Sequence, residues 1–182
     1  LEPISPYGAS KVAAEAIIKS LSKTFENFKY TIVRPFNIYG PGQSLSYSGV
    51  IVRFGRRLLE GLPPIIYGDG EQTRDFIYVE DVAEAIKSII ECRNAVNKTY
   101  NIGSGVPTRI IDLSKKMMDL LGVEYDPIHE PPRPGDIRHS YASINKIRRE
   151  VGWSPKTTLI EGLKKTIEWL SETLSRTPLQ SH

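Results

Sequence analysis

Residues 6–35 read PYGASKVAAEAIIKSLSKTFENFKYTIVRP, a helical pattern followed directly by a strand pattern. Apolar residues recur at helical spacing from Val12 to about Phe25, which predicts an amphipathic helix. Tyr30–Val33 is short and rich in β-branched residues, and Pro35 stops it, so we expect a buried strand there. A helix that leads directly into a buried strand is typical of the α/β class of folds.

Outward from this stretch, strands and helices continue to alternate to the end of the chain. We expect further helices at about 50–59, 80–90, 111–121, 144–151 and 159–174, strands at 65–67, 75–78 and 99–102, a turn at 37–42 and an extended proline-rich loop at 127–134. Residues 1–46 are interpreted as the tail end of a doubly wound parallel sheet, and part of 75–105 is a candidate to return to it. Residues 47–176 then form a smaller, separate α/β lobe, and 177–182 a disordered tail.

The composition is that of an ordinary globular domain and argues against several classes of partner. Of 182 residues, 40% are hydrophobic and 25% charged, and the net charge is only +3. Nucleic-acid-binding proteins usually gather far more Lys and Arg on one face, so we expect no nucleic-acid partner. No apolar run approaches the roughly 18 residues of a membrane helix, so we expect no membrane partner either. The single cysteine, Cys92, excludes an internal disulfide and is typical of the reducing cytoplasm.

Tyr7 and Lys11 lie four residues apart near the start of the first helix, so both side chains should project from one face. A free phenol loses its proton only near pH ~10, but an ammonium group beside it stabilises the phenolate. Such a pair can take a hydroxyl proton as a hydride leaves the same carbon, and can return it later. On spacing alone, an ordinary tyrosine at a helix start beside a solvated lysine is the commoner interpretation.

Several further motifs occur in order along the whole chain. They are Ser5–Lys11 (SPYGASK), Arg34–Gly42 (RPFNIYGPG), Gly68–Val79 (GDGEQTRDFIYV), Asn101–Gly105 (NIGSG), Arg133–Asp136 (RPGD), Gly152–Pro155 (GWSP) and Glu161–Leu163 (EGL). Together these motifs resemble the extended short-chain dehydrogenase/reductase family. Within that family they are most similar to the sugar-nucleotide epimerases, particularly the UDP-glucose 4-epimerases.

This resemblance implies a catalytic pair and a cofactor. Tyr7 would be the acid/base, and Lys11 would be its partner and would also bond the nicotinamide ribose of NAD. The backbone around Pro35 and Phe36 would pass close to the nicotinamide carboxamide. Residues 1–46 would then be the C-terminal remnant of a Rossmann-type NAD-binding domain.

The resemblance also implies a UDP-sugar site, most of it in the lobe at 47–176. Its residues would be Asn37 and Val50 at the pyrophosphate, Ile65, Ile66 and Tyr67 along the uracil, Arg74 and Arg133 on the phosphates, Asp136 on the ribose hydroxyls, and Ser140 beside the hexose 2-position. Guanidinium groups suit pyrophosphate oxygens because they bind them bidentately. Serine is a small residue for its place, so we expect room for an N-acetyl group on the sugar.

Simpler interpretations stay open for several of these residues. Arg74 could form a surface ion pair with Asp75, Arg133 could be a solvated loop residue, and Asp136 could belong to a plain turn. The neighbouring cluster on the second helix is expected to be a solvated face; it consists of Arg53, Arg56 and Arg57. A role of this cluster in binding the substrate phosphates stays open as the alternative.

Other features of such enzymes are missing from the sequence. No strand is followed by the glycine-rich fingerprint that binds a dinucleotide, because Gly103–Gly105 lacks the third glycine and is expected to be a turn. The family also places a Ser or Thr beside the tyrosine, from a strand upstream of Leu1. We therefore expect the chain to be the C-terminal part of an NAD enzyme, without the main NAD-binding loop and inactive alone. His129, His139 and His182 show no metal-ligand spacing, so no metal site is expected.

The most specific functional interpretation is a UDP-hexose 4-epimerase. Such an enzyme interconverts UDP-glucose and UDP-galactose through a 4-keto intermediate, and N-acetyl forms are included in the expectation. Two alternatives stay open: a nucleotide-sugar 4,6-dehydratase or decarboxylase on the same scaffold, and a non-catalytic module that binds sugar nucleotides. The first helix has more apolar positions than one sheet face needs, and the family pairs this helix across a dimer, so we expect a homodimer for the whole enzyme.

Overall fold

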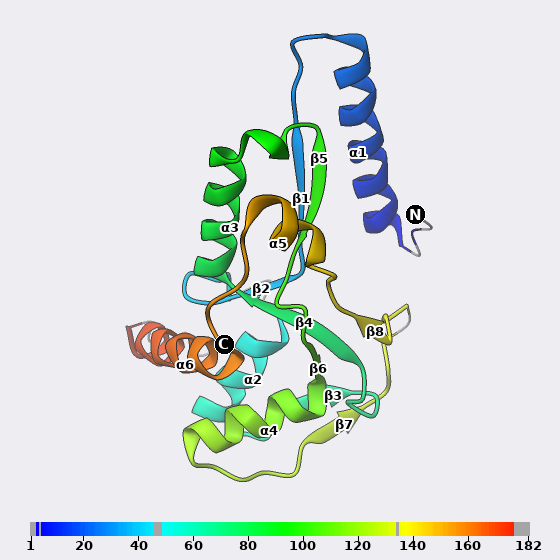
Figure 1. Cartoon of the computed structure of the whole chain (residues 1–182). Coiled ribbons are helices and arrows are strands. Elements are labelled where there is room, and N and C mark those ends of the chain that lie inside the picture. Colours follow the sequence, from blue (N-terminus) through cyan, green and yellow to red (C-terminus); the bar gives the residue numbers. More distant parts are fainter. Residues whose placement is uncertain (1–2, 4, 46–48, 134, 177–182) are drawn as a thin grey trace.

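The computed structural model describes residues 3, 5–45, 49–133 and 135–176, and it has the α/β class expected from the sequence (Figure 1). In chain order its elements are α1 (Pro6–Thr24), β1 (Thr31–Pro35), β2 (Asn37–Tyr39), α2 (Val50–Leu59), β3 (Ile65–Tyr67), β4 (Thr73–Tyr78), α3 (Val79–Glu91), η1 (Arg93–Ala95), β5 (Lys98–Ile102), β6 (Pro107–Arg109), α4 (Ile110–Leu121), β7 (Ile128–Glu130), β8 (His139–Ser140), α5 (Asn145–Val151) and α6 (Leu159–Arg176). None of the helices in the described ranges has both the length and the apolar character needed to cross a membrane. The tail expected at 177–182 lies outside the described residues.

Parallel pairing dominates the sheets. β1 pairs in parallel with β5, from Thr31 opposite Lys98 to Pro35 opposite Ile102. β2 and β8 both pair in parallel with β4, whose other partner, β6, runs antiparallel. β3 pairs in parallel with β7. Because a parallel pair needs a long crossover, each of these pairs brings together segments that are distant in the sequence.

Four short strands, β2, β6, β7 and β8, are not among the elements predicted from the sequence. β2 lies inside the expected turn at 37–42, and β7 lies inside the proline-rich loop at 127–134. β6 and β8 have only three and two residues. Runs this short show too little alternation to be recognised. They form because β3 and β4 offer backbone groups beside them that need hydrogen-bond partners.

Buried side chains form two clusters. One cluster packs α2, α4 and α6 against the neighbouring strands and includes Phe54 and Leu163. The other lies among α3, α5 and β5 and includes Tyr100. Gly55 allows the close approach of α2 to α6, because a Cβ there would lie 2.8 Å from Cδ2 of Leu170. The first cluster therefore fixes the position of α2, whose N-terminal turn borders the candidate site.

Helix α1 stands apart from both clusters, on the side of β1 and β5 opposite to α3 (Figure 1). Its start is well formed: Pro6 is in the first turn, and the Ser5 hydroxyl accepts a hydrogen bond of 3.1 Å from the N–H of Gly8. None of its residues is buried. Its ion pair with the sheet joins the guanidinium of Arg34, on β1, to the carboxylate of Glu15 at 2.5 and 2.6 Å.

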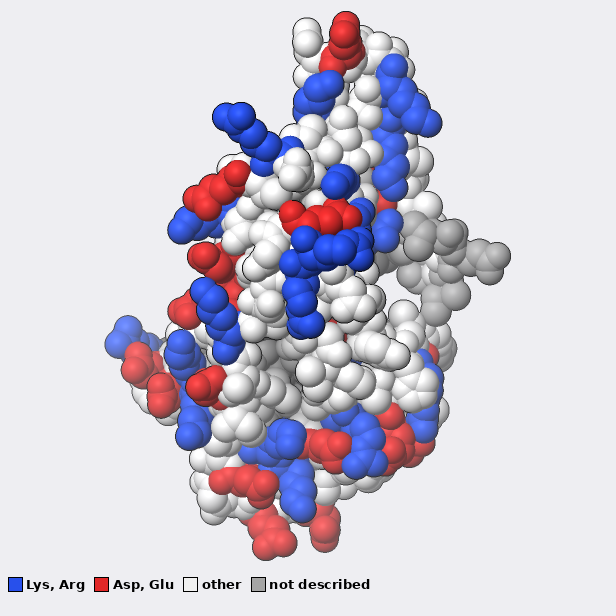
Figure 2. Space-filling model, in the orientation of Figure 1, with Lys and Arg blue, Asp and Glu red and all other residues white. Residues whose placement is uncertain are grey.

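Charges are mixed over most of the face seen in Figure 2. A row of basic side chains runs along α1, which contains Lys11, Lys19 and Lys23 and the single acid Glu15. Elsewhere on this face Lys and Arg alternate with Asp and Glu. Apart from the row on α1, this face therefore presents no wide field of one sign, the usual feature of a surface that binds a polyanion.

Candidate functional site

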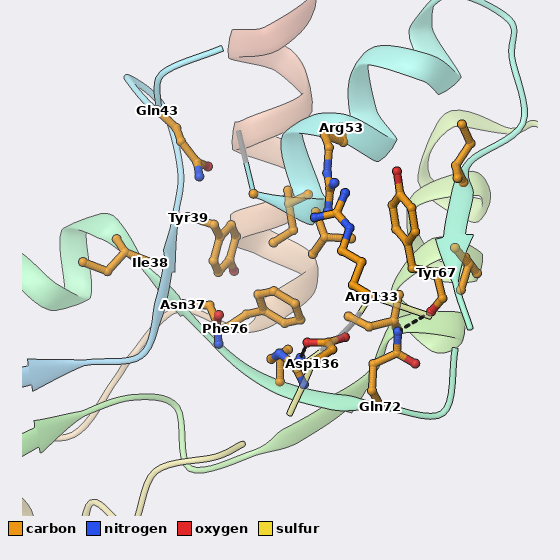
Figure 3. Close-up of a pocket in the computed structure, with 17 residues that line it drawn as sticks. Asn37, Ile38, Tyr39, Gln43, Arg53, Tyr67, Gln72, Phe76, Arg133 and Asp136 are labelled. Carbon is orange, nitrogen blue, oxygen red and sulfur yellow. Dashed lines mark hydrogen bonds and ion pairs between the residues drawn. The ribbon is translucent and has the colours of Figure 1, made fainter. Parts of the chain in front are cut away.

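A cavity of about 220 Å³ opens where the ends of several elements meet (Figure 3). Residues of β2, β3 and β4, the first turn of α2 and the segment after β7 form its wall. Of the residues predicted to bind substrate, the wall contains Asn37, Val50, Ile65, Ile66, Tyr67, Arg74, Arg133 and Asp136. Ser140 is not in this wall; it lies on β8, opposite Arg74 of β4.

The first turn of α2 borders the cavity and has no side-chain cap. Gly49, the N-cap residue, offers no side chain, and the first turn contains no acidic residue. Gly49, Val50 and Ile51 all line the cavity. The free backbone N–H groups and the dipole of a helix make its N-terminus favourable for an anion, above all for a phosphate. The local sequence at 49–51 therefore makes this part of the cavity wall favourable for binding a negatively charged group.

Two guanidinium groups reach into the cavity, that of Arg53 from α2 and that of Arg133 from the segment after β7 (Figure 3). Cζ of Arg133 lies 3.9 Å from the centroid of the Tyr67 ring, and Cζ of Arg53 lies 5.8 Å from it, both within reach of cation–π attraction. Within the described ranges, no ion pair joins either arginine to a carboxylate. Burial, and then the positive charge of Arg133, lower the pKa of Arg53 from its ordinary value. The described residues therefore leave the positive charge on this side of the cavity without a balancing carboxylate.

The prediction that Arg53, Arg56 and Arg57 form a solvated helix face is wrong for Arg53. Arg56 fits the prediction, because it is exposed and pairs with Glu60 at 2.8 Å. Arg57 donates to a backbone carbonyl at 2.5 Å. Arg53 comes three residues after Val50, so helical geometry puts both on one side of α2. That spacing is the signal in the sequence that could have placed Arg53 in the site.

Arg74, in contrast, is engaged in contacts within the protein. Its Nη2 forms an ion pair with Asp136, and its Nη1 donates to the carbonyls of Thr73 and Ile137 at 2.9 and 2.6 Å. The alternative of a surface ion pair with Asp75 is wrong, because Asp75 is 0% exposed. Arg74 therefore holds the segment of Asp136 and Ile137 against β4.

The carboxylate of Asp75 organises the turn after β5. It accepts hydrogen bonds from the backbone N–H groups of Ser104 (2.7 Å), Gly105 (2.9 Å) and Ala142 (3.0 Å), and from the Ser104 hydroxyl (2.6 Å). A Cβ at Gly103 would lie 2.7 Å from Oδ2 of Asp75, so this approach needs glycine. The N–H groups of Ser104 and Gly105 are thus used inside the protein and are not offered to a phosphate.

Gln72 is a candidate binding residue that reasoning from the sequence missed. Its side chain lines the cavity and is 8% exposed. Its Nε2 donates to the carbonyl of Tyr67 at 2.8 Å, which orients the amide, while its Oε1 is buried without a hydrogen-bond partner. An unsatisfied buried acceptor costs roughly 1–3 kcal/mol, so this oxygen indicates a ligand with an N–H or O–H group. No pattern in the sequence reveals this role of Gln72, because the orientation of its amide depends on the hydrogen bond to Tyr67 at the end of β3.

The structure places the side chains of Tyr7 and Lys11 next to each other, with Nζ of Lys11 5.3 Å from the centroid of the Tyr7 ring. Tyr7 is 73% exposed, and neither residue lines the cavity. Pro35 ends β1, and the N–H of Phe36 donates to the carbonyl of Ile102 at 2.9 Å. Pro35 and Phe36 therefore lie at the carboxyl end of the β1–β5 pair, the edge at which open α/β sheets bind ligands.

Fold and cavity together define an α/β protein with a site suited to a phosphate-bearing ligand that also has hydrogen-bond donors. Residues 1–103 match the model of the NAD dependent epimerase/dehydratase family. The chain belongs to this NAD-dependent family, whose members act on nucleotide sugars.

Relatives with different activities resemble the chain to a similar degree. A putative UDP-glucose 4-epimerase of Methanocaldococcus jannaschii is 36% identical over 171 residues, which are 93% of this chain and 54% of the relative. The crystal structure of UDP-glucose 4-epimerase with UDP-glucose from Thermotoga maritima has a TM-score of 0.90 at 38% identity, and the match covers 95% of this chain and 55% of that one. The structure of dTDP-glucose 4,6-dehydratase from Bacillus anthracis in complex with NAD has a TM-score of 0.86 at 30% identity, covering 97% and 55%. The chain spans about half the length of the curated relatives it matches.

Proposed function

We propose that this chain carries the substrate site and the acid/base pair of an NAD-dependent UDP-hexose 4-epimerase, which interconverts UDP-glucose and UDP-galactose. The observation that best supports this proposal is the cavity, in which residues from β2, α2, β3, β4 and the segment after β7 surround two guanidinium groups without a carboxylate partner among the described residues. These residues are distant in the sequence, and in the fold they bring together the N–H donors of guanidinium groups that a diphosphate needs as hydrogen-bond partners. The likeness to the Thermotoga maritima epimerase, crystallised with UDP-glucose, adds support.

In this proposal the UDP part of the substrate occupies the cavity. The diphosphate lies at the uncapped start of α2, within reach of the guanidinium groups. The uracil lies along β3, where main-chain groups of Ile65–Tyr67 can recognise its edge. The unpaired Oε1 of Gln72 accepts an N–H or O–H of the nucleoside, and Asp136 uses its free lone pairs on the ribose hydroxyls.

Tyr7 moves the proton in the proposed reaction. Its phenolate, stabilised by the ammonium of Lys11, takes the proton of the sugar 4-hydroxyl and later returns it to the oxygen of the 4-keto intermediate. NAD, when bound, supplies a hydride acceptor and donor. Tyr7, Lys11, Pro35 and Phe36 would hold its nicotinamide end, and the high exposure of Tyr7 fits a group that a ligand still has to cover. The N–H groups of Ser104 and Gly105 are not available to the rest of the cofactor, because both donate to the carboxylate of Asp75.

We further propose that residues 1–46 belong to a Rossmann-type NAD-binding domain, that β5 returns to it, and that 47–176 is otherwise the substrate lobe. Among the described strands β1 pairs with β5 alone, so its other edge is free for a further strand of such a sheet. Apolar side chains of α1 and of its C-cap residue are also exposed to solvent: Ile17 is 61% exposed and Phe25, the C-cap residue, is 58% exposed. A sheet on one side of this helix and a second subunit on the other would bury them.

A nucleotide-sugar 4,6-dehydratase is the second candidate. The observation in its favour is the similarity to the Bacillus anthracis dehydratase over nearly the whole chain. The two activities share the oxidation at C4, so Tyr7 would take the same proton in both. They differ after that oxidation. A dehydratase would eliminate water across C5 and C6 of the keto intermediate, and the hydride taken up at the first step would then be returned to C6, with a proton to C5, to give a 4-keto-6-deoxy sugar nucleotide.

Calorimetry and turnover together test the proposed function. The 182-residue chain should bind UDP-glucose in isothermal titration calorimetry, and absence of binding would refute the proposed site. The chain joined to a dinucleotide-binding domain of the family should convert UDP-galactose to UDP-glucose. Tyr7→Phe should lower kcat by roughly 10²- to 10⁴-fold without weakening UDP-glucose binding. Release of a 4-keto-6-deoxy product would identify the dehydratase instead, and binding without any turnover would indicate a non-catalytic module.

Ser140 supplies a test of the substrate range. The proposed role beside the hexose 2-position predicts that the chain also accepts UDP-N-acetylhexosamines. Ser140→Tyr should then abolish binding of UDP-N-acetylglucosamine and leave UDP-glucose binding nearly unchanged. Equal loss of both ligands would show that Ser140 supports β8 and its pairing with Arg74, and does not limit the sugar pocket.

A further inference from the structure

Near its start, α1 carries a phenol, an ammonium and a carboxylate at successive turns. Tyr7, Lys11 and Glu15 follow one another at intervals of four residues, which a helix places next to each other on one side. Lys11 therefore lies one turn from the phenol and one turn from the carboxylate. Its Nζ is 5.3 Å from the centroid of the Tyr7 ring, and among the described residues no ion pair joins Lys11 to a carboxylate.

The Glu15 side chain should attract any cation within its reach. It is only 15% exposed, so little water screens its charge. The hydrogen bond from Arg34 holds the pKa of Glu15 below 4.5, so this carboxylate is charged at neutral pH. The position of Lys11 over the phenol therefore requires that another group occupies the carboxylate.

Arg34, on β1, is that group. Its Nε donates to Oε1 of Glu15 at 2.5 Å, and its Nη2 donates to Oε2 at 2.6 Å. Lys19, from the next turn of α1, contacts Oε2 at 3.2 Å. The charged groups placed around the Glu15 carboxylate thus come from both elements, with Lys11 and Lys19 on α1 and Arg34 on β1. A bidentate guanidinium is the strongest of these partners.

Arg34 also connects the two parts of the proposed catalytic centre. It directly precedes Pro35, at the carboxyl end of β1 where the nicotinamide is proposed to lie. Its partner Glu15 belongs to α1, the helix of the proposed acid/base pair, and this helix stands apart from both buried clusters (Figure 1). One ion pair therefore joins the helix to the strand and occupies the carboxylate nearest to Lys11 along α1.

We propose that Arg34 is a positioning residue: by neutralising Glu15, it leaves the ammonium of Lys11 to Tyr7. Without the guanidinium, Oε1 of Glu15 would be a largely shielded negative oxygen in need of a cation, and Lys11 is one turn away. Lys11 would then turn from Tyr7 to Glu15, and the Tyr7 phenolate would lose the charge that stabilises it. This inference rests on the proposed function, since it concerns the pair that moves the proton there.

Crystal structures of the 182-residue chain and of its Arg34→Met variant test the position of Lys11 directly. In the variant, Nζ of Lys11 should lie within about 4 Å of the Glu15 carboxylate and no longer over the Tyr7 ring. Arg34→Lys keeps the charge and should leave Lys11 over the ring. Lys11 still over the ring in Arg34→Met would overturn the inference. If Arg34→Met does not fold, Arg34→Ile takes its place, because a β-branched residue suits a strand.

Turnover by the chain joined to a dinucleotide-binding domain separates this role from simple anchoring of α1. Arg34→Met and Glu15→Gln break the same ion pair, so anchoring alone predicts equal losses of kcat. Only Arg34→Met leaves a carboxylate that competes for Lys11, so it should lower kcat roughly tenfold or more at neutral pH, and Glu15→Gln less than about threefold. Arg34→Met combined with Glu15→Gln should recover the kcat of Glu15→Gln alone. Equal losses in the single variants, or no recovery in the double variant, would overturn the inference.

The pH profile and KM provide readouts that a loss of packing would not produce. The deficit in kcat of Arg34→Met should shrink as the pH rises, because alkali forms the phenolate without help from Lys11. KM for UDP-galactose should change less than about twofold, since neither Arg34 nor Glu15 lines the cavity proposed for UDP. Lys23→Met removes a positive charge from the last turn of α1 and is the matched control, with an unchanged kcat and pH profile. A deficit of the same size at every pH would contradict the inference.

Failure of the proposed function would look different from failure of this inference. If the unmodified joined enzyme does not convert UDP-galactose, the epimerase proposal is wrong, and the crystal structures still decide whether Arg34 controls the position of Lys11. If that enzyme is active and Lys11 stays over Tyr7 in Arg34→Met, only the role of Arg34 is wrong.

Discussion

Helices α1 and α6 have nearly the same length and very different surroundings. α1 has 19 residues, none of them buried, whereas α6 has 18 and buries Gly162, Leu163, Thr166, Ile167 and Leu170. Both carry apolar residues at helical spacing. α6 packs against α2 and α4, while α1 meets β1 through the ion pair between Glu15 and Arg34. An apolar stripe thus shows which face of a helix has to be buried. Only the fold shows whether other elements of the described chain pack against that face.

The largest expected effect comes from shortening matched leucines of the two helices. Leu163→Ala in α6 should lower the free energy of unfolding by about 2–5 kcal/mol, because it opens a cavity at a site that is 0% exposed. Leu21→Ala in α1 should change it by less than about 0.5 kcal/mol, since Leu21 is exposed. Urea denaturation of both variants measures the difference. An equal loss in both would mean that α1 is packed against something in solution, for example a second subunit.

Replacing a buried aspartate should likewise reduce stability more than replacing an exposed one. Asp75→Asn should cost about 2–4 kcal/mol, because the amide places N–H groups against donors that Asp75 now satisfies. Asp126→Asn is the matched control, and it should be neutral because Asp126 is exposed. Thermal unfolding followed by circular dichroism separates the two. A neutral Asp75→Asn would show that the turn at 103–105 does not depend on the carboxylate.

The ion pair of α1 should have a smaller effect, confined to that helix. Glu15→Gln removes the charge but keeps the shape, and should cost about 1 kcal/mol in the opening of α1. Amide hydrogen exchange should speed up within Pro6–Thr24 and stay unchanged in α6. Faster exchange in both helices would contradict the view that α1 is held separately.

Acid should act on α1 through the same carboxylate. The hydrogen bond from Arg34 holds the pKa of Glu15 below its ordinary value of 4.5, despite the opposing effect of burial. A carboxyl whose pKa is lowered on folding contributes stability that is fully present above pH 4.5 and is lost as the pH falls through the lowered pKa. The protection of α1 amides against hydrogen exchange should therefore decrease as the pH falls below 4.5. Glu15→Gln should remove this dependence of the protection on pH.

The smallest expected effect on stability is that of Tyr7→Phe. Tyr7 is 73% exposed, so losing its hydroxyl should change the free energy of unfolding by less than about 0.5 kcal/mol. A melting temperature equal to that of the unmodified chain would make this variant a clean probe of the proposed acid/base role. A clear destabilisation would show instead that the hydroxyl supports the start of α1.

Much of the fold could be predicted from local patterns, and the short strands could not. The spacing of apolar residues indicates α2 and α4 to within a residue of their ends, and Gly122 ends α4 in the left-handed conformation that glycine favours. β7 escapes the same reasoning because three residues between prolines show no period. It forms only because the segment Pro64–Tyr67 lies beside it and provides hydrogen-bond partners. One of these hydrogen bonds runs from the N–H of Ile128 to the carbonyl of Pro64.

The sequence by itself determined the α/β class, the family motifs and the short-range pairing of Tyr7 with Lys11, since a helix repeats every 3.6 residues. Only the tertiary structure decided which arginines have counter-charges. Arg74 contacts Asp136, which is 62 residues away in the sequence, and Asp75 contacts Ser104, which is 29 residues away. No local sequence pattern predicts contacts at such separations. Among the described residues, Arg53 and Arg133 in the cavity consequently have no carboxylate partner. The packing of the chain, and not the neighbouring residues in the sequence, determines which carboxylate lies beside an arginine.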